Sequence, residues 1–189
     1  MATDLQRGGM AVEFSLVLII FVMAMFGMME YARMMYLWNT QQETARRAAR
    51  AAAVTDFSDS GAMQALRRKA LFRSDDGALP LAPNVTPDVV RIDYLSLSAA
   101  GTMAAVPVMP GCPARNVVNC TTDPHAGNCI RLVRVRLCGD DASSGLGGCA
   151  ALPYVPLLPL IPAPASLPTS TTIVRAESLG YRPGQPLCP

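Results

Sequence analysis

The sequence contains little of what catalysis and nucleic-acid binding use. Its 189 residues include one histidine, and they contain neither a Gly-rich phosphate loop nor a G-x-S-x-G motif. Paired carboxylates in an apolar setting, which general acid and base chemistry uses, are also absent. The net charge of +2 is too small for a nucleic-acid-binding surface. We therefore expect neither an enzyme nor a nucleic-acid-binding protein, and we expect no cofactor.

Metal-binding spacings are missing as well. The cysteines form no C-x2-C or C-x4-C pair, and His125 has no partner histidine. An even number of cysteines, all in the polar part of a small chain, predicts disulfides in an oxidising compartment instead. Their pairing stays open, because this number of cysteines allows many combinations. The disulfide candidates are Cys112, Cys120, Cys129, Cys138, Cys149 and Cys188.

Charge is nearly absent from one long stretch near the N-terminus. In residues 10–29 the only charge is Glu13, and about 20 apolar residues in a helix span the roughly 30 Å of a bilayer core. The alternative is a cleaved secretory signal, which has a shorter apolar run, of about 7 to 15 residues, and then a small-x-small site. Here residues 30–33 (EYAR) follow the run. We predict an uncleaved transmembrane helix.

The helical pattern continues beyond the apolar stretch, and neither Pro nor Gly occurs in residues 28–55. We predict one helix over residues 9–55, half in lipid and half in water. Its covering face is expected to hold Tyr31, Met35, Trp38, Gln42, Ala45, Ala49 and Ala52. The opposite face is expected to hold Arg33, Thr40, Glu43, Arg47 and Arg50.

The remainder of the chain predicts a small α+β domain. Apolar residues at helical spacing indicate a short helix over residues 62–72, and alternating segments indicate strands within residues 89–97, 130–138 and 169–179. In the first strand Val90, Ile92 and Tyr94 share one face. We expect an antiparallel sheet whose apolar face is covered by the aqueous half of the long helix.

Two further segments have the composition of irregular structure. Residues 109–128 combine cysteines with turn residues and are predicted to form a disulfide-tied loop. Prolines recur at every third residue from Pro153 to Pro162, which indicates a stiff polyproline strap packed on the domain. The side chains that this strap is expected to bury are Leu157, Leu158, Leu160 and Ile161.

The N-terminus carries a motif of its own. Gly8 and Gly9 precede the apolar run, and Glu13 lies at the fifth position counted from Gly9. This arrangement resembles the site of prepilin peptidases, which implies cleavage between Gly8 and Gly9. In a filament, Glu13 of one subunit would neutralise the new α-amine of a neighbour, since an unpaired charge in a low-dielectric core is costly. The alternative is a glutamate that simply lies at the lipid headgroups.

The whole of residues 7–54 resembles the TadE-like family of the Flp, or tight-adherence, type IV pilus system. The resemblance lies in residues 11–18 (AVEFSLVL), 30–33 (EYAR) and 43–53 (ETARRAARAAA). Later stretches that are similar to the family's C-terminal strands and Pro-containing connection are 133–135, 154–159 and 172–178. The cysteine-bearing region, residues 112–149, is longer than this family leads us to expect.

The resemblance implies a minor pilin or pseudopilin with a leader (residues 1–8), a transmembrane helix (9–29), a helical stalk (30–55) and a periplasmic α+β domain (56–189). The chain would then cross the bacterial inner membrane once, with its N-terminus in the cytoplasm. Implied partners are the membrane, the prepilin peptidase, a major pilin, a second minor pilin and the pilus assembly machinery of this secretion system. The alternative is a bitopic envelope protein whose periplasmic domain binds a ligand or partner and whose helix is a simple anchor.

The distribution of arginines opposes this orientation. Arg7 precedes the apolar run, whereas Arg33, Arg46, Arg47 and Arg50 follow it, and the positive-inside rule alone would place the domain in the cytoplasm. Long domains translocate largely regardless of charge. We therefore give the cysteines and the N-terminal motif more weight.

The first prediction concerns processing. In cells with a prepilin peptidase, the mature chain should begin at Gly9, and Gly8→Ala should slow cleavage more than Gly9→Ala, because the enzyme cuts after the glycine. The mass of the purified protein measures both effects. A chain that still begins at Met1 in piliated cells would contradict the prediction.

Overall fold

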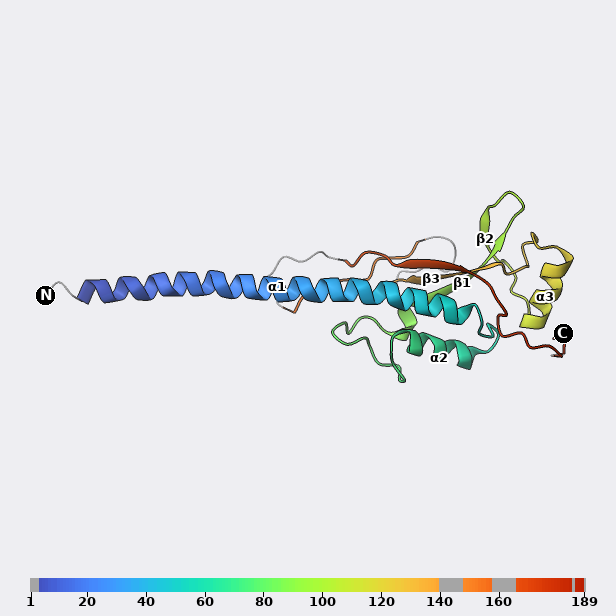
Figure 1. Cartoon of the computed structure of the whole chain (residues 1–189), viewed down its shortest axis with the longest axis horizontal. Helices are drawn as coiled ribbons and strands as arrows, with labels where there is room; N and C mark the ends of the chain where they lie inside the picture. Colours follow the sequence, from blue (N-terminus) through green and yellow to red (C-terminus); the bar gives the residue numbers. More distant parts are fainter. Residues whose placement is uncertain (1–3, 140–147, 158–165, 185, 189) are drawn as a thin grey trace.

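The computed structural model describes residues 4–139, 148–157, 166–184 and 186–188. One long helix, α1 (Asp4–Ala52), forms a rod, and the other elements pack along its C-terminal half (Figure 1). The N-terminus lies at one end of the molecule and the C-terminus at the other. The predicted single helix through the apolar stretch and the stalk is therefore confirmed.

The domain on the rod combines short helices with one sheet. The helices are α2 (Ser60–Ala70), the single turn η1 (Pro87–Val89) and α3 (Pro113–Thr122). The strands are β1 (Val90–Leu97), β2 (Met103–Ala105), β3 (Leu132–Leu137) and β4 (Thr171–Arg175), in the order β2-β1-β3-β4 with every neighbour antiparallel. The predicted α+β fold is confirmed.

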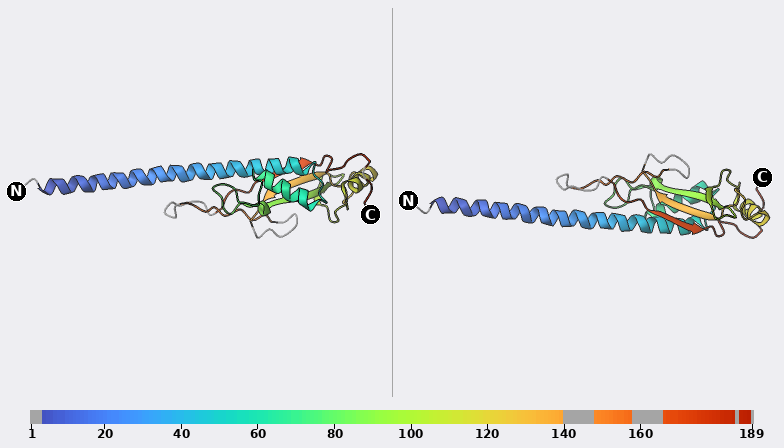
Figure 2. Two further views of the ribbon diagram at one scale, coloured as in Figure 1. Left: turned by 90° about the horizontal axis from the view of Figure 1, so that it is seen from below. Right: turned by 90° about the horizontal axis from the view of Figure 1, so that it is seen from above.

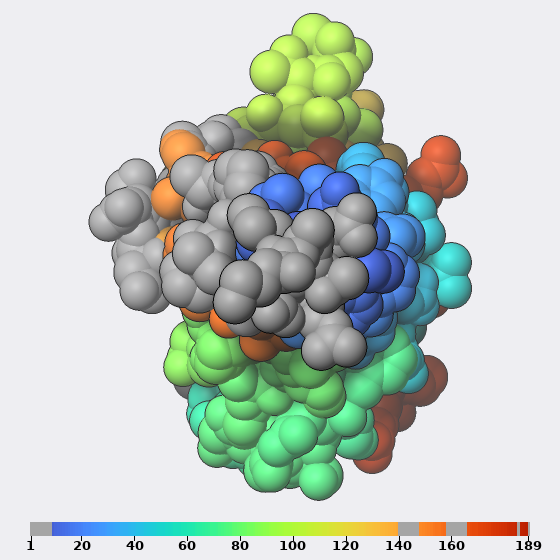
Figure 3. Space-filling view, turned by 90° about the vertical axis from the view of Figure 1, so that its left-hand side faces the viewer, coloured from blue at the N-terminus to red at the C-terminus, as the bar shows by residue number. Residues whose placement is uncertain are grey.

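Strand β2 is the strand that the sequence did not predict, because three residues are too few to show an alternating pattern. It forms a hairpin with β1 through the pairs Leu95 with Ala105 and Leu97 with Met103. Figure 3, viewed from the N-terminal end, shows this yellow-green hairpin projecting from the body of the domain. Met103 is 47% exposed there.

The faces of the sheet follow the predicted alternation. Val90, Ile92 and Tyr94 of β1 lie opposite Leu137, Val135 and Val133 of β3. Cross-strand partners share a face, so these residues form one apolar layer. Val133 and Val135 are completely buried in it.

The other face of the same strands is charged. Asp93 of β1 pairs with two arginines of β3, Arg134 at 2.8 Å and Arg136 at 2.9 Å. Both arginine side chains are largely buried, and both lie within ion-pair distance of the same carboxylate oxygen, Oδ2 of Asp93. Opposite charges on neighbouring strands favour the observed register.

The apolar layer of the sheet is covered by α1, which packs against β3 and β4 (Figure 2). Ala45, Ala49 and Ala52 are buried at this contact, as the sequence predicts. Alanine side chains are short, so the helix can approach the strands closely. The aqueous half of α1 is thus the cover that the sheet needs.

Nearer the membrane segment, the predicted covering face is wrong. Tyr31 is 59% exposed, whereas Leu37 is buried in the core. Arg33, predicted on the solvent face, is only 7% exposed. The buried face of α1 here differs from the predicted one, because Arg33 forms a buried ion pair, as described below.

Helix α2 confirms the predicted second helix. Asp59 is its N-cap, and its carboxylate accepts a hydrogen bond from the N–H of Ala62 at 2.9 Å. The helix buries Met63, Leu66 and Ala70 toward the core. It therefore packs on α1 as a second cover beside the sheet.

The cysteine-rich region differs from the prediction of a loop, because residues 113–122 form α3. Pro113 suits the first turn of a helix, while the β-branched valines and threonines of α3 are weak helix formers that concealed the pattern. Inside the fold, the side-chain oxygen of Asn116 accepts the N–H of Ile130 at 2.8 Å. The predicted disulfides are confirmed, and the pairs are Cys112–Cys188, Cys120–Cys129 and Cys138–Cys149.

The Pro-rich segment is described only up to Leu157 and again from Ser166, so Leu158, Leu160 and Ile161 lie outside the described residues. Leu152 and Tyr154 are buried, but Leu157 is 57% exposed, which contradicts its predicted burial. The N–H of Leu167 donates to the carbonyl of Leu152 at 2.8 Å. The segment packs on the domain through alternate residues.

The end of α1 is fastened by the C-terminal part of the chain. The carbonyl of Ala53 accepts the N–H groups of Glu177 and Leu179, at 3.1 and 3.0 Å. Gly180 then has a φ of 84° and lies directly on the backbone of Asp56. A Cβ at Gly180 would be 2.6 Å from the nitrogen of Asp56, which no side chain can occupy.

The second prediction compares two glycines. Gly184 has nearly the same positive φ as Gly180, 83°, but a Cβ there meets no described atom within 4 Å. Gly184→Ala should lower the free energy of unfolding by about 1 to 2 kcal/mol through backbone strain alone. Gly180→Ala should lower the free energy of unfolding by about 1 to 3 kcal/mol more than Gly184→Ala does, because the backbone of Asp56 must move. Urea unfolding measures both, and equal losses would contradict the close approach.

Candidate functional site

The N-terminal half of α1 presents its apolar side chains outward. Phe14, Ile20 and Phe21 are each more than 60% exposed. Within Gly9–Ala52 the helix is long and apolar enough to cross a membrane, and none of its apolar window is buried in the protein. So large an apolar surface is not left in water by a folded protein, and lipid is the solvent that suits it. The helix thus fits a single-pass membrane anchor.

The predicted processing and assembly residues lie at the start of this segment. Gly8 and Gly9 are within α1, and Glu13 is exposed one turn further along. Residues four apart share a helix face, so Glu13 lies on the same side as Gly9. The arrangement places one acid beside the predicted new terminus.

A second polar group lies where the apolar run ends, and the sequence did not predict it. Glu30 and Arg33 form an ion pair of 3.0 Å, and their side chains are each 6% exposed. They are separated by three residues and therefore share the face of α1 that turns toward the domain. This is a desolvated charge pair beside the end of a membrane segment.

The pair is bound by segments from distant parts of the chain. Nε and Nη2 of Arg33 donate to the carbonyl of Leu81 at 3.1 and 2.7 Å. Nη1 donates to the carbonyl of Val155 at 2.8 Å, and Glu30 accepts the N–H of Leu157 at 3.3 Å. Buried charges need such hydrogen bonds to offset the loss of water.

Tyr154 completes this group, which we call the exit cluster: Glu30, Arg33 and Tyr154 with the backbone of Leu81, Val155 and Leu157. Its hydroxyl donates to Oε1 of Glu30, and the guanidinium of Arg33 lies 5.1 Å from the centre of its ring. Burial, and after it the hydrogen bond to Glu30, raises the pKa of Tyr154 above its ordinary value. The hydroxyl is a donor at neutral pH. Its contribution to stability is complete below the ordinary tyrosine pKa and is lost as the pH rises from there through the raised pKa.

Leu81 has an unusual backbone in this cluster, with a φ of 65°. A bulky residue seldom adopts a positive φ, and the strain costs about 1 to 3 kcal/mol. The conformation directs the carbonyl of Leu81 at Arg33 while its side chain stays 57% exposed. The hydrogen bonds to a buried cation stabilise this strained turn.

Two signals could have revealed the exit cluster. Opposite charges three residues apart, at the first positions beyond an apolar run, indicate a pair that shares one helix face. A tyrosine within a Pro-rich apolar stretch offers a hydroxyl that needs a partner when buried. Neither signal says that Glu30 and Tyr154 meet, because they are 124 residues apart.

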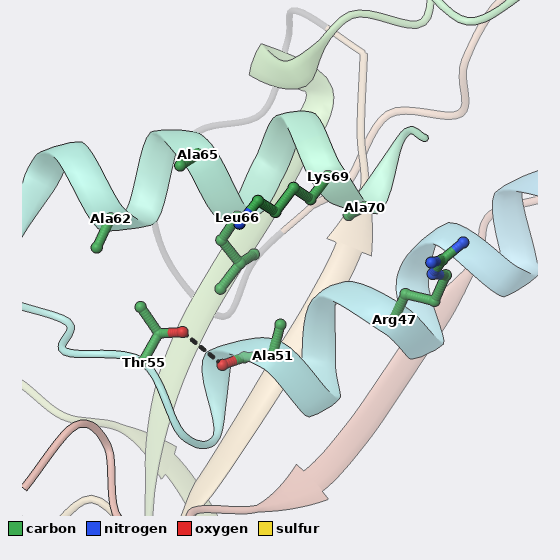
Figure 4. A pocket seen from close by; sticks show the side chains of 8 residues that line it. All are labelled: Arg47, Ala51, Thr55, Ala62, Ala65, Leu66, Lys69 and Ala70. Carbon is green, nitrogen blue, oxygen red and sulfur yellow. Dashed lines mark hydrogen bonds between the residues drawn. The ribbon is translucent and has the colours of Figure 1, made fainter. Parts of the chain in front are cut away.

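A groove of about 410 Å³ lies between α1 and α2, as Figure 4 shows. The ionisable side chains that line it are Arg47 and Lys69, which are both cations. Among the described side chains, the groove therefore has no pair that could act as general acid and general base. The guanidinium of Arg47 already lies 4.1 Å from the ring centre of Phe72. We assign no reaction to this groove, whose lining is Arg47, Ala51, Thr55, Ala62, Ala65, Leu66, Lys69 and Ala70.

The fold and these groups define a class: an α+β domain carried on one N-terminal helix that fits a single membrane anchor. Residues 8–50 match the family model described as TadE-like protein. The resemblance inferred from the sequence is thus confirmed over this segment, which includes Gly8, Gly9, Glu13, Glu30 and Arg33. The match covers less than half of the chain, so it describes this N-terminal segment as TadE-like. No curated protein and no solved structure matches the chain.

The third prediction tests the exit cluster. Glu30→Gln and Arg33→Gln should each lower the free energy of unfolding by about 3 to 5 kcal/mol, because each leaves the other charge buried and unpaired. The double variant should lose clearly less than the sum of the two. Urea unfolding of the full chain in detergent, followed by the fluorescence of Trp38, the one tryptophan, measures this.

The matched control is Arg50→Gln, an exposed arginine on the same helix. It should change the free energy of unfolding by less than about 0.5 kcal/mol. Strictly additive losses for Glu30→Gln and Arg33→Gln would show that the two side chains do not act as a pair.

Proposed function

We propose that this protein is a pilin-like minor subunit, a minor pilin or pseudopilin, of a tight-adherence type IV pilus. In this proposal a prepilin peptidase removes residues 1–8. Before assembly, the subunit is anchored in the bacterial inner membrane with its disulfide-bonded domain in the periplasm. Its partners are other pilin-like subunits and the pilus assembly machinery. Its role is structural, with no catalysed reaction, cofactor or nucleic acid.

The observation that carries the proposal is the position of Glu13. It is the only charge in residues 10–29 and is exposed on the lipid-facing half of α1. A carboxylate in an apolar environment is costly unless a cation neutralises it. The α-amine that cleavage would create at Gly9 of a neighbouring subunit is such a cation, and it would make assembly favourable.

Two features of the chain support this role. The TadE-like match covers the segment that holds both the cleavage motif and the glutamate. In addition, the three disulfides suit an oxidising compartment such as the periplasm, which is the side that the proposal assigns to the domain. A simple membrane anchor would need neither a glycine motif nor a charge within its apolar run.

The fourth prediction is that Glu13→Gln reduces surface pili by about tenfold or more in a complementation assay. Removing one member of a desolvated charge pair costs about 3 to 5 kcal/mol, and a tenfold effect needs only about 1.4 kcal/mol. The amount of protein in the membrane should be unchanged or higher, because the apolar segment loses its charge. Pili are counted on cells, and membrane levels are measured in parallel.

The control is Glu43→Gln, the same change at an exposed position on the aqueous half of the same helix. It should leave pili at the wild-type number. Normal piliation by Glu13→Gln at normal protein level would reject the proposal and favour the anchored binding domain instead.

A further inference from the structure

Loops from two distant parts of the chain contact α1 at the same level along the helix axis, that of Glu30 and Arg33. The guanidinium of Arg33 donates hydrogen bonds to the carbonyls of Leu81 and Val155. The carboxylate of Glu30 accepts one from the N–H of Leu157. Side chains of a helix tilt toward its N-terminus, so the Arg33 guanidinium lies over the turn that begins at Glu30. Figures 1 and 2 show the orange segment, residues 148–157, running back toward the N-terminal half of α1. Both loops therefore lie at the end of the apolar run.

This height coincides with the surface of a membrane. The apolar residues 10–29 account for roughly 30 Å of helix, which is the thickness of the hydrocarbon core. The polar headgroups add about 5 to 7 Å on each side. Arg33 follows Met29 by four residues, about 6 Å along the axis. The exit cluster is therefore at the level of the headgroups when α1 spans a bilayer.

The loops present apolar side chains at that level. Leu81 and Leu157 are each 57% exposed and Val155 is 49% exposed. In the segment that holds them, Leu152 and Tyr154 turn inward, so Val155 and Leu157 are left on the outer side. Tyr31 of α1, also at this height, is 59% exposed. Tyrosines are enriched at membrane surfaces, where one end of the ring is apolar and the other end is wet.

We propose that Leu81, Val155 and Leu157 rest in the headgroup layer of the same membrane that α1 crosses. The domain then lies on the bilayer surface instead of standing off it on a free stalk. Arg33 is neutralised by Glu30, so apolar burial, rather than attraction to acidic lipids, holds the loops there. The inference needs only that α1 spans a membrane, and it does not depend on pilus assembly.

The experiment places a tryptophan on each loop of the full chain. Trp38, the one tryptophan, is first replaced in Trp38→Phe. Leu81→Trp, Leu157→Trp and the control Val118→Trp are then made separately and reconstituted in phosphatidylcholine vesicles. Val118 is 41% exposed on α3, at the far end of the domain (Figure 1). Lipids brominated near the headgroup quench a tryptophan in the bilayer surface, and iodide quenches one in water.

We expect bromolipids to quench Leu81→Trp and Leu157→Trp about threefold or more above Val118→Trp, since the headgroup layer is only about 5 to 7 Å deep. Iodide should show the reverse order. Equal access of iodide to all three positions would overturn the proposal. Protection from iodide without bromolipid quenching, rising with the ratio of protein to lipid, would also overturn it and assign the loops to a second copy of the chain. The two loops report independently, so a variant that fails to fold leaves the other to decide.

Discussion

A buried ion pair, Glu30 with Arg33, determines how the domain is attached to its helix. Taking both charges out of water costs several kcal/mol each, and their mutual attraction offsets this only when further hydrogen bonds satisfy them. Those bonds come from Tyr154 and from the backbone of the loops at Leu81 and Val155. The pair is therefore stable only when the loops are in place, and in turn it fastens both loops to α1.

The aqueous half of α1 is thus fastened at two points. At the membrane side the exit cluster binds it, and at the distal side the carbonyl of Ala53 accepts hydrogen bonds from the C-terminal segment. Between these points the buried alanines of α1 lie against the sheet. The aqueous half of the helix has no Pro or Gly, so it and the domain form one unit in which the position of each loop along α1 is set.

The two acids at the ends of the apolar run contrast with each other. Glu30 is neutralised within the same chain, because it forms an ion pair with Arg33. Glu13 has no ion pair within the described chain and is exposed on the lipid-facing surface. A subunit that joins an assembly needs such an acid to remain available for a neighbour, whereas a structural acid is satisfied internally. This difference is why the proposed assembly role falls on Glu13.

The amino-acid sequence by itself determined the features that repeat locally. Helix period, apolar run length and strand alternation predicted α1 and the shared sheet face of Val90, Ile92 and Tyr94, and the cysteine count predicted a disulfide-bonded domain. What depends on distant contacts was decided only by the tertiary structure: the three cysteine pairs, helix α3 and the burial of Arg33. The charge of Arg33 predicts exposure unless a partner is known, and its partner Tyr154 lies 121 residues away. A local sequence pattern cannot predict such a contact, because the two residues meet only when the chain has folded.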